Sequence, residues 1–503
     1  MVGVSRSKAC ADCKRRRVKC DLTSPRCQRC TKAGIICRGI RNEPTLWVHQ
    51  TPNQPNVSAL SVIQSQQQTN SNWLSLLQRM RSQVNSKEIY DVPTFRSEAL
   101  SIAVSIYFPQ GRFTTSEEDH SSTPSSWLKA VCRMEGPSDA LDHSLVAFCA
   151  IQIRLSGEVR VSYDEAIELY NHALSRVIHV LDCPCIGNND ESLAAIVILS
   201  TCELFLFHAS TSWNAHAQGV SEILRHRAVP GTNTSNWNDL CRRLCVICVI
   251  QALSQKSPLI LDPNLWRKHI GPWDAPDSFS ALLDIIIDIP SAMAEAHVLA
   301  SSDETDCGRL QRYVNLLLDK FYVLDDWRGL VHCNIAARNQ TPLYWSVPSR
   351  ASNPADDGYP DKLFPFALVF SSLEGASPWI VCCSFMLDIL ETILLLRAKL
   401  ASLDVSQFLG GSLNGSIEKE SPNQADADHI ARMLCQSVEY CYRSENGTFG
   451  PQITCNAQAT LLGYFAGRGM KRELEWCRAI KYMTGPGTSF GIDLMQFKPP
   501  PEL

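Results

Sequence analysis

The stretch "CADCKRRRVKC" occupies 10–20, and a second stretch, "CQRCTKAGIIC", follows at 27–37. Both have the pattern C-x2-C-x6-C, and six residues separate them. The window from 10 to 37 therefore holds six cysteines, whereas the 466 residues after it hold sixteen. Because this window has few large apolar side chains, it cannot build a hydrophobic core unaided. The cysteines must supply the cross-links that hold it together.

The rest of the sequence indicates which kind of cross-link to expect. The first residues, "MVGVSRSK", lack the apolar core of a secretion signal. The two most apolar segments, 194–209 and 379–396, contain Glu203 in the first and Asp388 and Glu391 in the second. We expect both to be buried helices rather than membrane spans, and we expect the chain to be intracellular. In a reducing compartment, clustered cysteines are typical of metal sites rather than disulfides.

Zinc chemistry limits how six thiolates can be used. Zn²⁺ prefers four tetrahedral ligands and binds thiolates well. Six thiolates can complete the four-ligand shell of one ion and leave two sulfurs unused. Alternatively, they can complete the shells of two ions if two sulfurs bridge both. The internal repeat favours the second arrangement, because each C-x2-C pair can grip one ion and each distant cysteine can complete its shell. Nearby Lys and Arg side chains then help to neutralise the remaining negative charge.

These spacings resemble the fungal zinc binuclear cluster family (Zn(2)-C6 fungal-type), and Pro25 stands where that family usually has a loop proline. The resemblance implies two Zn²⁺ per chain. In it, Cys10 and Cys27 bridge the two ions. Cys13 and Cys20 complete one zinc shell, and Cys30 and Cys37 complete the other.

A basic run, "KRRRVK", fills the first interval of six residues. Residues 1–42 hold 12 Lys and Arg against 2 Asp and Glu, whereas the remainder holds 35 against 49. A basic head on an acidic body indicates that the head binds a polyanion. Alone, the run is equally typical of a nuclear-localisation signal or a solvated charged face. Within the cysteine pattern it favours contact with DNA.

The resemblance implies a helix in the major groove of double-stranded DNA at CGG-type triplet sites. In the family's motif, Arg16 and Arg17 take the base-reading positions, and arginine is the commonest partner of guanine O6 and N7. The other basic residues are expected to contact phosphate, which gives affinity without sequence information. The predicted DNA-binding residues are Lys14, Arg15, Arg16, Arg17, Lys19 and Arg26.

Composition divides the chain into a DNA-binding domain at 1–42, a polar linker with a short helix at 43–89, and a helical body at 90–503. The uncharged segment 51–72 is too polar to order itself. Residues 73–84, "WLSLLQRMRSQV", have helical spacing but span less than two heptads. They form either a weak zipper or, as we favour, a helix packed on the acidic body. We therefore expect residues 1–90 to be monomeric and any homodimer to form through the helical body.

The body is expected to be an all-α array, since strand-like alternation is scarce. Ser162 and Glu165 have capping-box spacing at the start of one helix. The body resembles the fungal-specific transcription factor domain, through helical pairs that end in a Trp213–His216–Gly219 pattern. Further helices are predicted at 236–255, 280–299, 308–323, 379–399, 427–442 and 456–481, and long loops at 342–365 and 410–426. The expected fold is thus a small metal-organised Zn2Cys6 cluster followed by a large all-α regulatory domain.

These features predict a sequence-specific transcription factor rather than an enzyme. The expected setting is the nucleus, with RNA polymerase II transcription as the regulated process and the transcription machinery as a partner. A biosynthetic (secondary metabolite) gene cluster is our guess for the target. The alternative is a hydrolase or redox enzyme with an appended zinc module. The sequence has no H-E-x-x-H or P-loop motif, and its G-x-S-x-G match, "GTSFG" at 487–491, follows no clear strand.

Overall fold

The computed structural model describes most of the chain, with the backbone alone at 59–71, 132 and 339. The described residues are 13, 18–21, 27–34, 59–86, 91–109, 123–157, 160–181, 190–206, 219–221, 223–225, 234–303, 305–339, 341–358, 360–403, 421–485 and 487. The chain divides into two compact units, 1–66 and 67–503. The first unit contains the short helix α2 (Gln28–Lys32).

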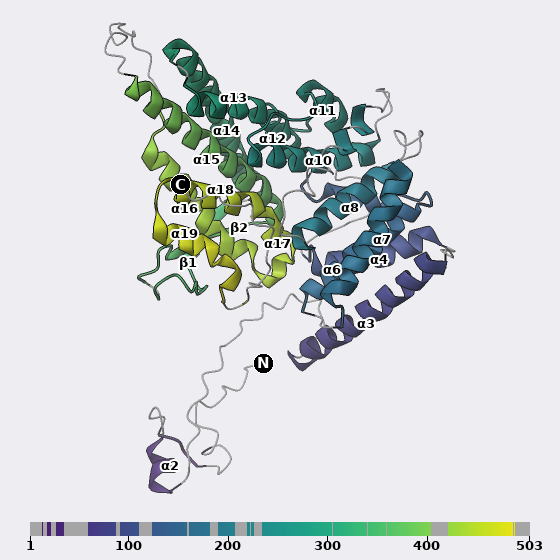
Figure 1. The fold of residues 1–503 in the computed structure, drawn as a ribbon. Helices are drawn as coiled ribbons and strands as arrows, with labels where there is room; N and C mark the ends of the chain where they lie inside the picture. The colour runs from purple at the N-terminus through teal and green to yellow at the C-terminus, as the bar shows by residue number, and fades with distance from the viewer. Residues whose placement is uncertain are drawn as a thin grey trace. The chain divides into compact units, whose positions relative to one another are not determined.

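From residue 59 onward the structure is mainly helical (Figure 1). The helices before the strands are α3 (Ala59–Ser86), α4 (Val92–Ile106), α5 (Ser126–Cys132), α6 (Asp139–Leu155), α7 (Tyr163–Leu181), α8 (Asp190–Leu206), α10 (Ser235–Ser254), α11 (Pro263–Ile270), α12 (Phe279–Ile286), α13 (Ile289–Ser301) and α14 (Cys307–Asn339). The strands are β1 (Tyr344–Pro348) and β2 (Phe366–Phe370). They are followed by α15 (Leu373–Ser402), α16 (Gln424–Cys441), η2 (Ser444–Asn446), α17 (Phe449–Ile453), α18 (Cys455–Gly467), α19 (Lys471–Arg478) and η3 (Ile480–Tyr482). The predicted mostly helical body is confirmed.

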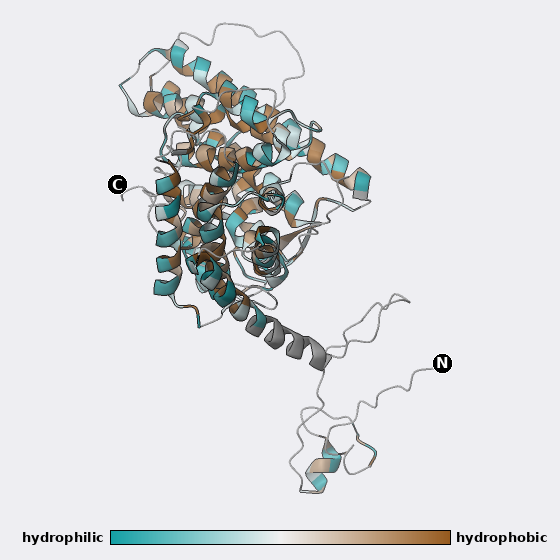
Figure 2. Cartoon of the chain, turned by 90° about the vertical axis from the view of Figure 1, so that its right-hand side faces the viewer, coloured by the Kyte–Doolittle hydropathy of each residue, from teal (hydrophilic) through white to brown (hydrophobic). Residues whose placement is uncertain are grey.

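The first half of the body is organised around α6, which packs against α4, α7 and α8. The helix α7 begins at the predicted cap, where the Glu165 N–H donates to the Ser162 hydroxyl at 3.0 Å. Its buried side chains share one face, as its apolar spacing predicts: Ala166, Leu169, Tyr170, Ala173 and Val177. In contrast, α8 is buried on nearly every side. Figure 2 shows the corresponding pattern, with hydrophilic residues on the outer sides of helices and hydrophobic residues between them.

The second half is organised around α15, which packs against α13, α14, α16 and α18. By length and composition, α15 is apolar enough to cross a membrane, but 78% of its most apolar window is buried inside the body. It is therefore a core helix of this unit, as its internal acidic residues predict.

The helix α3 begins earlier than the sequence indicates. It covers 59–86, so its first half lies in the segment that was expected to be unstructured. In its second half, Leu74, Leu77, Met80 and Val84 are buried in the main hydrophobic core. Arg79 pairs with Glu98 of α4, and Arg81 lies 2.6 Å from Glu165 of α7. The residues 73–84 thus pack on the body, which is the arrangement we favour over a zipper.

Several boundaries differ from those expected. The predicted loop at 342–365 begins with β1, which pairs with β2 in an antiparallel ladder from Tyr344–Phe370 to Pro348–Phe366. The sequence of β1, YWSVP, does not alternate strictly between apolar and polar residues. The predicted helix 280–299 is two helices, because Pro290 starts α13. The predicted helix 456–481 ends at a turn around Gly469, whose φ is +68°, before α19. Most of the predicted loop 410–426, and Trp213 and His216, lie outside the described residues.

The two halves are joined where the segment before α17 meets the end of α4. The N–H groups of Thr448 and Phe449 donate to the carbonyls of Ile106 and Tyr107, at 3.2 and 2.9 Å. Gly447 has a φ of +57°, and a Cβ there would collide with these same carbonyl oxygens. Glycine is therefore required at this close approach.

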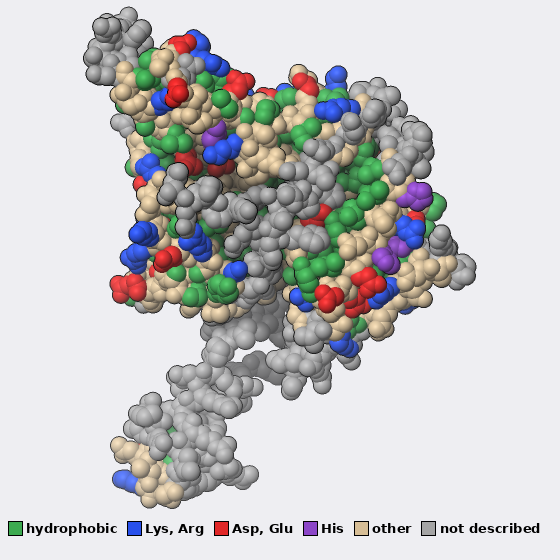
Figure 3. Space-filling model, in the orientation of Figure 1, with side chains coloured by type: hydrophobic (Ala, Val, Ile, Leu, Met, Phe, Trp, Pro, Cys, Tyr) green, Lys and Arg blue, Asp and Glu red, His purple; other side chains and the backbone are tan. Residues whose placement is uncertain are grey.

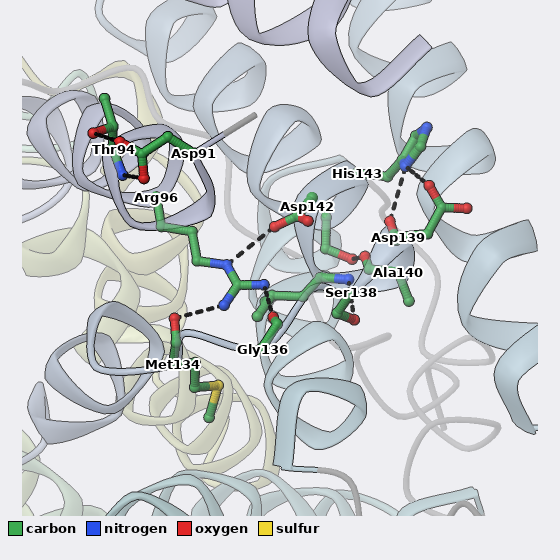
Figure 4. Close-up of polar contacts among 12 residues, drawn as sticks. Asp91, Thr94, Arg96, Met134, Gly136, Ser138, Asp139, Ala140, Asp142 and His143 are labelled. Atoms are coloured by element: carbon green, nitrogen blue, oxygen red, sulfur yellow. Dashed lines mark hydrogen bonds and ion pairs between the residues drawn. The ribbon is translucent and has the colours of Figure 1, made fainter. Parts of the chain in front are cut away.

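A buried charged pair fixes α4 on α6 (Figure 4). Arg96 is 1% exposed, and its Nε donates to Asp142 Oδ1 at 3.1 Å. Its two other nitrogens donate to the carbonyls of Met134 and Gly136, at 2.6 and 2.7 Å. Burial raises the pKa of Asp142, and Arg96 opposes that rise. One side chain thus satisfies a carboxylate and two carbonyls that water cannot reach.

We predict that Arg96→Met lowers the free energy of unfolding of the body by about 3–5 kcal/mol, because it leaves Asp142 buried without its partner. The double variant Arg96→Met/Asp142→Asn should recover part of that loss. Denaturation followed by tryptophan fluorescence measures both, since residues 1–42 contain no Trp. A loss below about 1 kcal/mol for the single variant would contradict the structural role of this pair.

A second carboxylate, partly buried, lies on α15. Burial and, to a smaller extent, the neighbouring Glu391 raise the pKa of Asp388 to about 8, while Thr460 and Lys256 oppose the rise. Thr460 of α18 donates its hydroxyl to Asp388 Oδ2 at 3.2 Å. Arg468 and Lys256 lower the raised pKa of Glu391. The folded state therefore favours protonated Asp388, whereas the unfolded chain ionises near the ordinary value of 3.8.

The pKa of Asp388 is higher in the folded state than in the unfolded state. The stability that protonated Asp388 contributes is therefore fully present below about pH 4 and is lost progressively as the pH rises to about 8. We predict that Asp388→Asn, which keeps an acceptor for Thr460, removes this loss. The melting temperature of the variant should exceed that of the unmodified protein by an amount that grows from pH 5 to pH 8. If instead the two melting temperatures differ by the same amount at every pH in this range, Asp388 is ionised in the folded body and the prediction is wrong.

Candidate metal centre

The described part of the first unit is built around Cys27. Its extended backbone precedes α2, and its Sγ accepts a hydrogen bond from the Cys30 N–H at 3.4 Å. The Thr31 hydroxyl donates to the Cys27 carbonyl at 3.1 Å. The C-x2-C spacing thus places one cysteine at the helix cap and the other in its first turn.

Asp21 fixes the start of the same helix. Its two carboxylate oxygens accept hydrogen bonds from the N–H groups of Gln28 and Arg29, at 3.2 and 2.9 Å. Together with the Cys27 sulfur, it satisfies three of the N–H groups that a helix leaves unpaired at its start. Since Asp21 follows Cys20 directly, this contact ties the end of the first C-x2-C-x6-C stretch to the start of the second.

The cysteine sulfurs converge from both stretches. Cys13, Cys27 and Cys30 are buried at 0–1% exposure, with Cys20 and Val18 packed against them. The Cys13 and Cys27 sulfurs lie 3.6 Å apart, and those of Cys13 and Cys30 lie 3.8 Å apart. The sulfurs of Cys13, Cys20 and Cys27 all lie within 4.8 Å of one another.

These separations fit zinc. Two thiolates on one tetrahedral Zn²⁺, with Zn–S bonds of about 2.3 Å, lie about 3.8 Å apart. A disulfide would need a separation of about 2.05 Å. The donor set, all sulfur and buried, is the one that structural zinc sites use. The separations between the described cysteine sulfurs therefore fit coordination to a metal ion and do not fit a disulfide bond.

The allocation of ligands between the two ions stays a prediction. Cys13 lies at a suitable distance from both Cys27 and Cys30, so these distances permit either pair to share an ion. The predicted ligands Cys10 and Cys37 lie outside the described residues. The grouping of Cys13, Cys20 and Cys27 agrees with the set that the family resemblance assigns to one zinc.

The predicted DNA-binding residues fall mostly outside the described part of the chain. Lys14, Arg15, Arg16, Arg17 and Arg26 are not described, whereas Lys19 is exposed. Arg29 and Lys32 are also exposed on α2, and the sequence analysis did not single them out. Figure 3 shows a Lys or Arg side chain at the surface of this unit, whereas the visible face of the body mixes both signs of charge.

Residues 8–45 match the family model of the fungal Zn(2)-Cys(6) binuclear cluster domain. A binuclear cluster of this kind binds two zinc ions, so the cofactor prediction is confirmed. The matched domain is a DNA-binding domain, and it supports a fungal DNA-binding transcription factor. No curated protein and no solved structure matches the chain. The resemblance of the body to the fungal-specific transcription factor domain is not shown by a family model.

Sequence reasoning missed Asp21, Arg29 and Lys32. Asp21 is one of only two acidic residues in 1–42, and an isolated acid in a basic segment is a usable signal for a structural contact. Its partners are backbone groups seven and eight residues away. Because backbone N–H groups are the same in every residue except proline, the sequence does not show which of them Asp21 will bind.

We predict that the full-length protein contains two zinc ions and that Cys27→Ser reduces this content below two, because Cys27 is the expected bridging ligand. Cys333→Ser is the matched control, since Cys333 is exposed on α14 of the body. Elemental analysis of the three purified proteins measures the ratio of zinc to protein. Two zincs in Cys27→Ser, or a loss of zinc in Cys333→Ser, would contradict the assignment.

Proposed function

We propose that this protein is a nuclear, sequence-specific regulator of RNA polymerase II transcription that binds CGG-type sites in double-stranded DNA through its zinc cluster. The observation that carries the proposal is the match at 8–45, together with the convergence of the buried Cys13, Cys27 and Cys30 with the partly buried Cys20. The same match favours a DNA-binding function over the enzyme alternative. A biosynthetic gene cluster remains our proposal for the target.

The basic run has a defined place in this function. It lies between Cys13 and Cys20, whose sulfurs lie within 4.8 Å of each other. Metal binding therefore fixes both ends of the run. The Val18 N–H also donates to the Cys13 carbonyl at 3.1 Å. A run held in this way presents its side chains to DNA with less conformational entropy to lose than a free basic tail.

Two classes of contact are proposed within the run. Arg16 and Arg17 read bases, because a guanidinium donates two hydrogen bonds to guanine. Lys14, Arg15, Lys19 and Arg26 hold phosphates, which positions the domain without reading sequence. The exposed Lys19 is the described member of this set. Arg29 and Lys32 add positive charge on the adjacent helix.

The body is proposed to serve regulation and assembly. Its large helical core and the packed residues 73–84 leave no described zipper next to the cluster. If the chain pairs, we therefore expect the contact to come from the body, and contacts with the transcription machinery to come from there too. A single cluster then binds a single triplet site.

We predict that Arg16→Ala and Arg17→Ala each cost about 1–3 kcal/mol on a CGG site and relax specificity at one base. Lys19→Ala should weaken binding to CGG and scrambled duplexes alike and lower the slope of log K against log salt by about 0.9. Fluorescence anisotropy with both duplexes at several salt concentrations separates the two classes.

Arg472→Ala is the matched control. Arg472 is an exposed residue of the body that pairs with Asp357 at 3.2 Å, so the variant changes the net charge equally without touching the cluster. It should leave affinity and salt slope unchanged. Equal losses on both duplexes for every variant in the run would refute the division into base readers and phosphate contacts. No preference for CGG in the unmodified protein would refute the proposed site.

A further inference from the structure

The body has a partly open cavity where α8, α10 and α12 meet α15, α17 and α18. Its volume is about 60 Å³. Most of its wall is apolar, formed by side chains such as Leu204, Val246, Phe279, Val381 and Phe449. A purely apolar cavity of this kind would stay dry and need no ligand. This one also has polar side chains in its wall, and three of them share one feature.

Three side chains that line the cavity have buried N–H groups without a hydrogen-bond partner. They are Arg243 of α10 through Nε, Gln452 of α17 through Nε2, and Asn456 of α18 through Nδ2. All three atoms are donors. The Gln452 amide is oriented by Tyr107, whose hydroxyl donates to Oε1 at 2.7 Å, so its Nε2 is the group left over. Buried donors of this kind are normally satisfied.

The charge of the cavity is positive. An arginine side chain keeps its proton under all ordinary conditions. Burial lowers the pKa of Arg243, with only Tyr107 and Cys455 opposing that change. Among the described residues that line the cavity there is no Asp or Glu. Water could satisfy the donors, but it could not neutralise the guanidinium. An anion does both.

We propose that this cavity binds a small aliphatic carboxylate. The carboxylate accepts hydrogen bonds from Arg243, Gln452 and Asn456, and its short apolar chain lies against the side chains of α8, α10 and α15. A charge-assisted bond to arginine is the strongest contact that such a ligand can make. The proposal concerns the helical body alone, so it stands or falls independently of the DNA-binding function.

The test uses the full-length, zinc-loaded protein with butyrate as the probe. Isothermal titration calorimetry should show saturable binding at one site per chain, and the melting temperature of the body should rise with butyrate concentration. Butyramide has nearly the same shape but no charge, so it should not bind. Chloride at the same concentration separates a carboxylate site from a general anion site, and should give little stabilisation.

Arg243→Gln should weaken butyrate binding by at least about tenfold, since it removes the charged donor. Arg472→Gln, at an exposed position of the body, is the matched control and should bind butyrate normally. Should Arg243→Gln fail to fold, the comparison of butyrate with butyramide on the unmodified protein decides by itself. Absence of saturable butyrate binding, equal binding of butyramide, or equal stabilisation by chloride would each overturn the proposal.

Discussion

Bonding between thiolates and zinc is the interaction on which the N-terminal unit depends. Its described core consists of Cys13, Cys27 and Cys30, with little apolar area around them, so burial alone cannot fold it. Metal coordination brings the two cysteine stretches together, and the Asp21 and Cys27 contacts then fix α2. The basic run, which we propose as the DNA-binding surface, lies between Cys13 and Cys20, so metal coordination also fixes its two ends. Folding, metal content and DNA binding are therefore one linked equilibrium.

The body depends on different physics. It buries a continuous apolar core, and residues far apart in the chain meet in it. The carbonyls at the end of α4 accept hydrogen bonds from the segment before α17 only because Gly447 has no side chain. Around this junction Tyr107 packs edge-on against Trp127 and Phe148. The body has its own core, separate from the cysteine cluster, so we expect its folding not to depend on zinc.

Local patterns in the sequence predicted the features that depend on neighbours in the chain. The C-x2-C turn at Cys27 and Cys30 and the cap at Ser162 are features of this kind. Features that depend on distant partners were not predicted. The strand β1 exists because β2, some twenty residues later, completes its ladder. Likewise α3 extends through a polar segment because its second half is anchored in the core.

The residues of the cavity show most clearly why sequence pattern has a limit. Arg242 and Arg243 are adjacent on α10, and on a helix their side chains point about 100° apart. A pattern analysis would place both on a solvated face. However, α10 packs against α5, α8, α11, α12 and α13, so little of it faces water. Arg242 pairs with Asp239 at 2.9 Å within its own helix, whereas Arg243 lines the cavity with donors from α17 and α18. More than two hundred residues separate Arg243 from Gln452, and only the folded body makes them parts of one site.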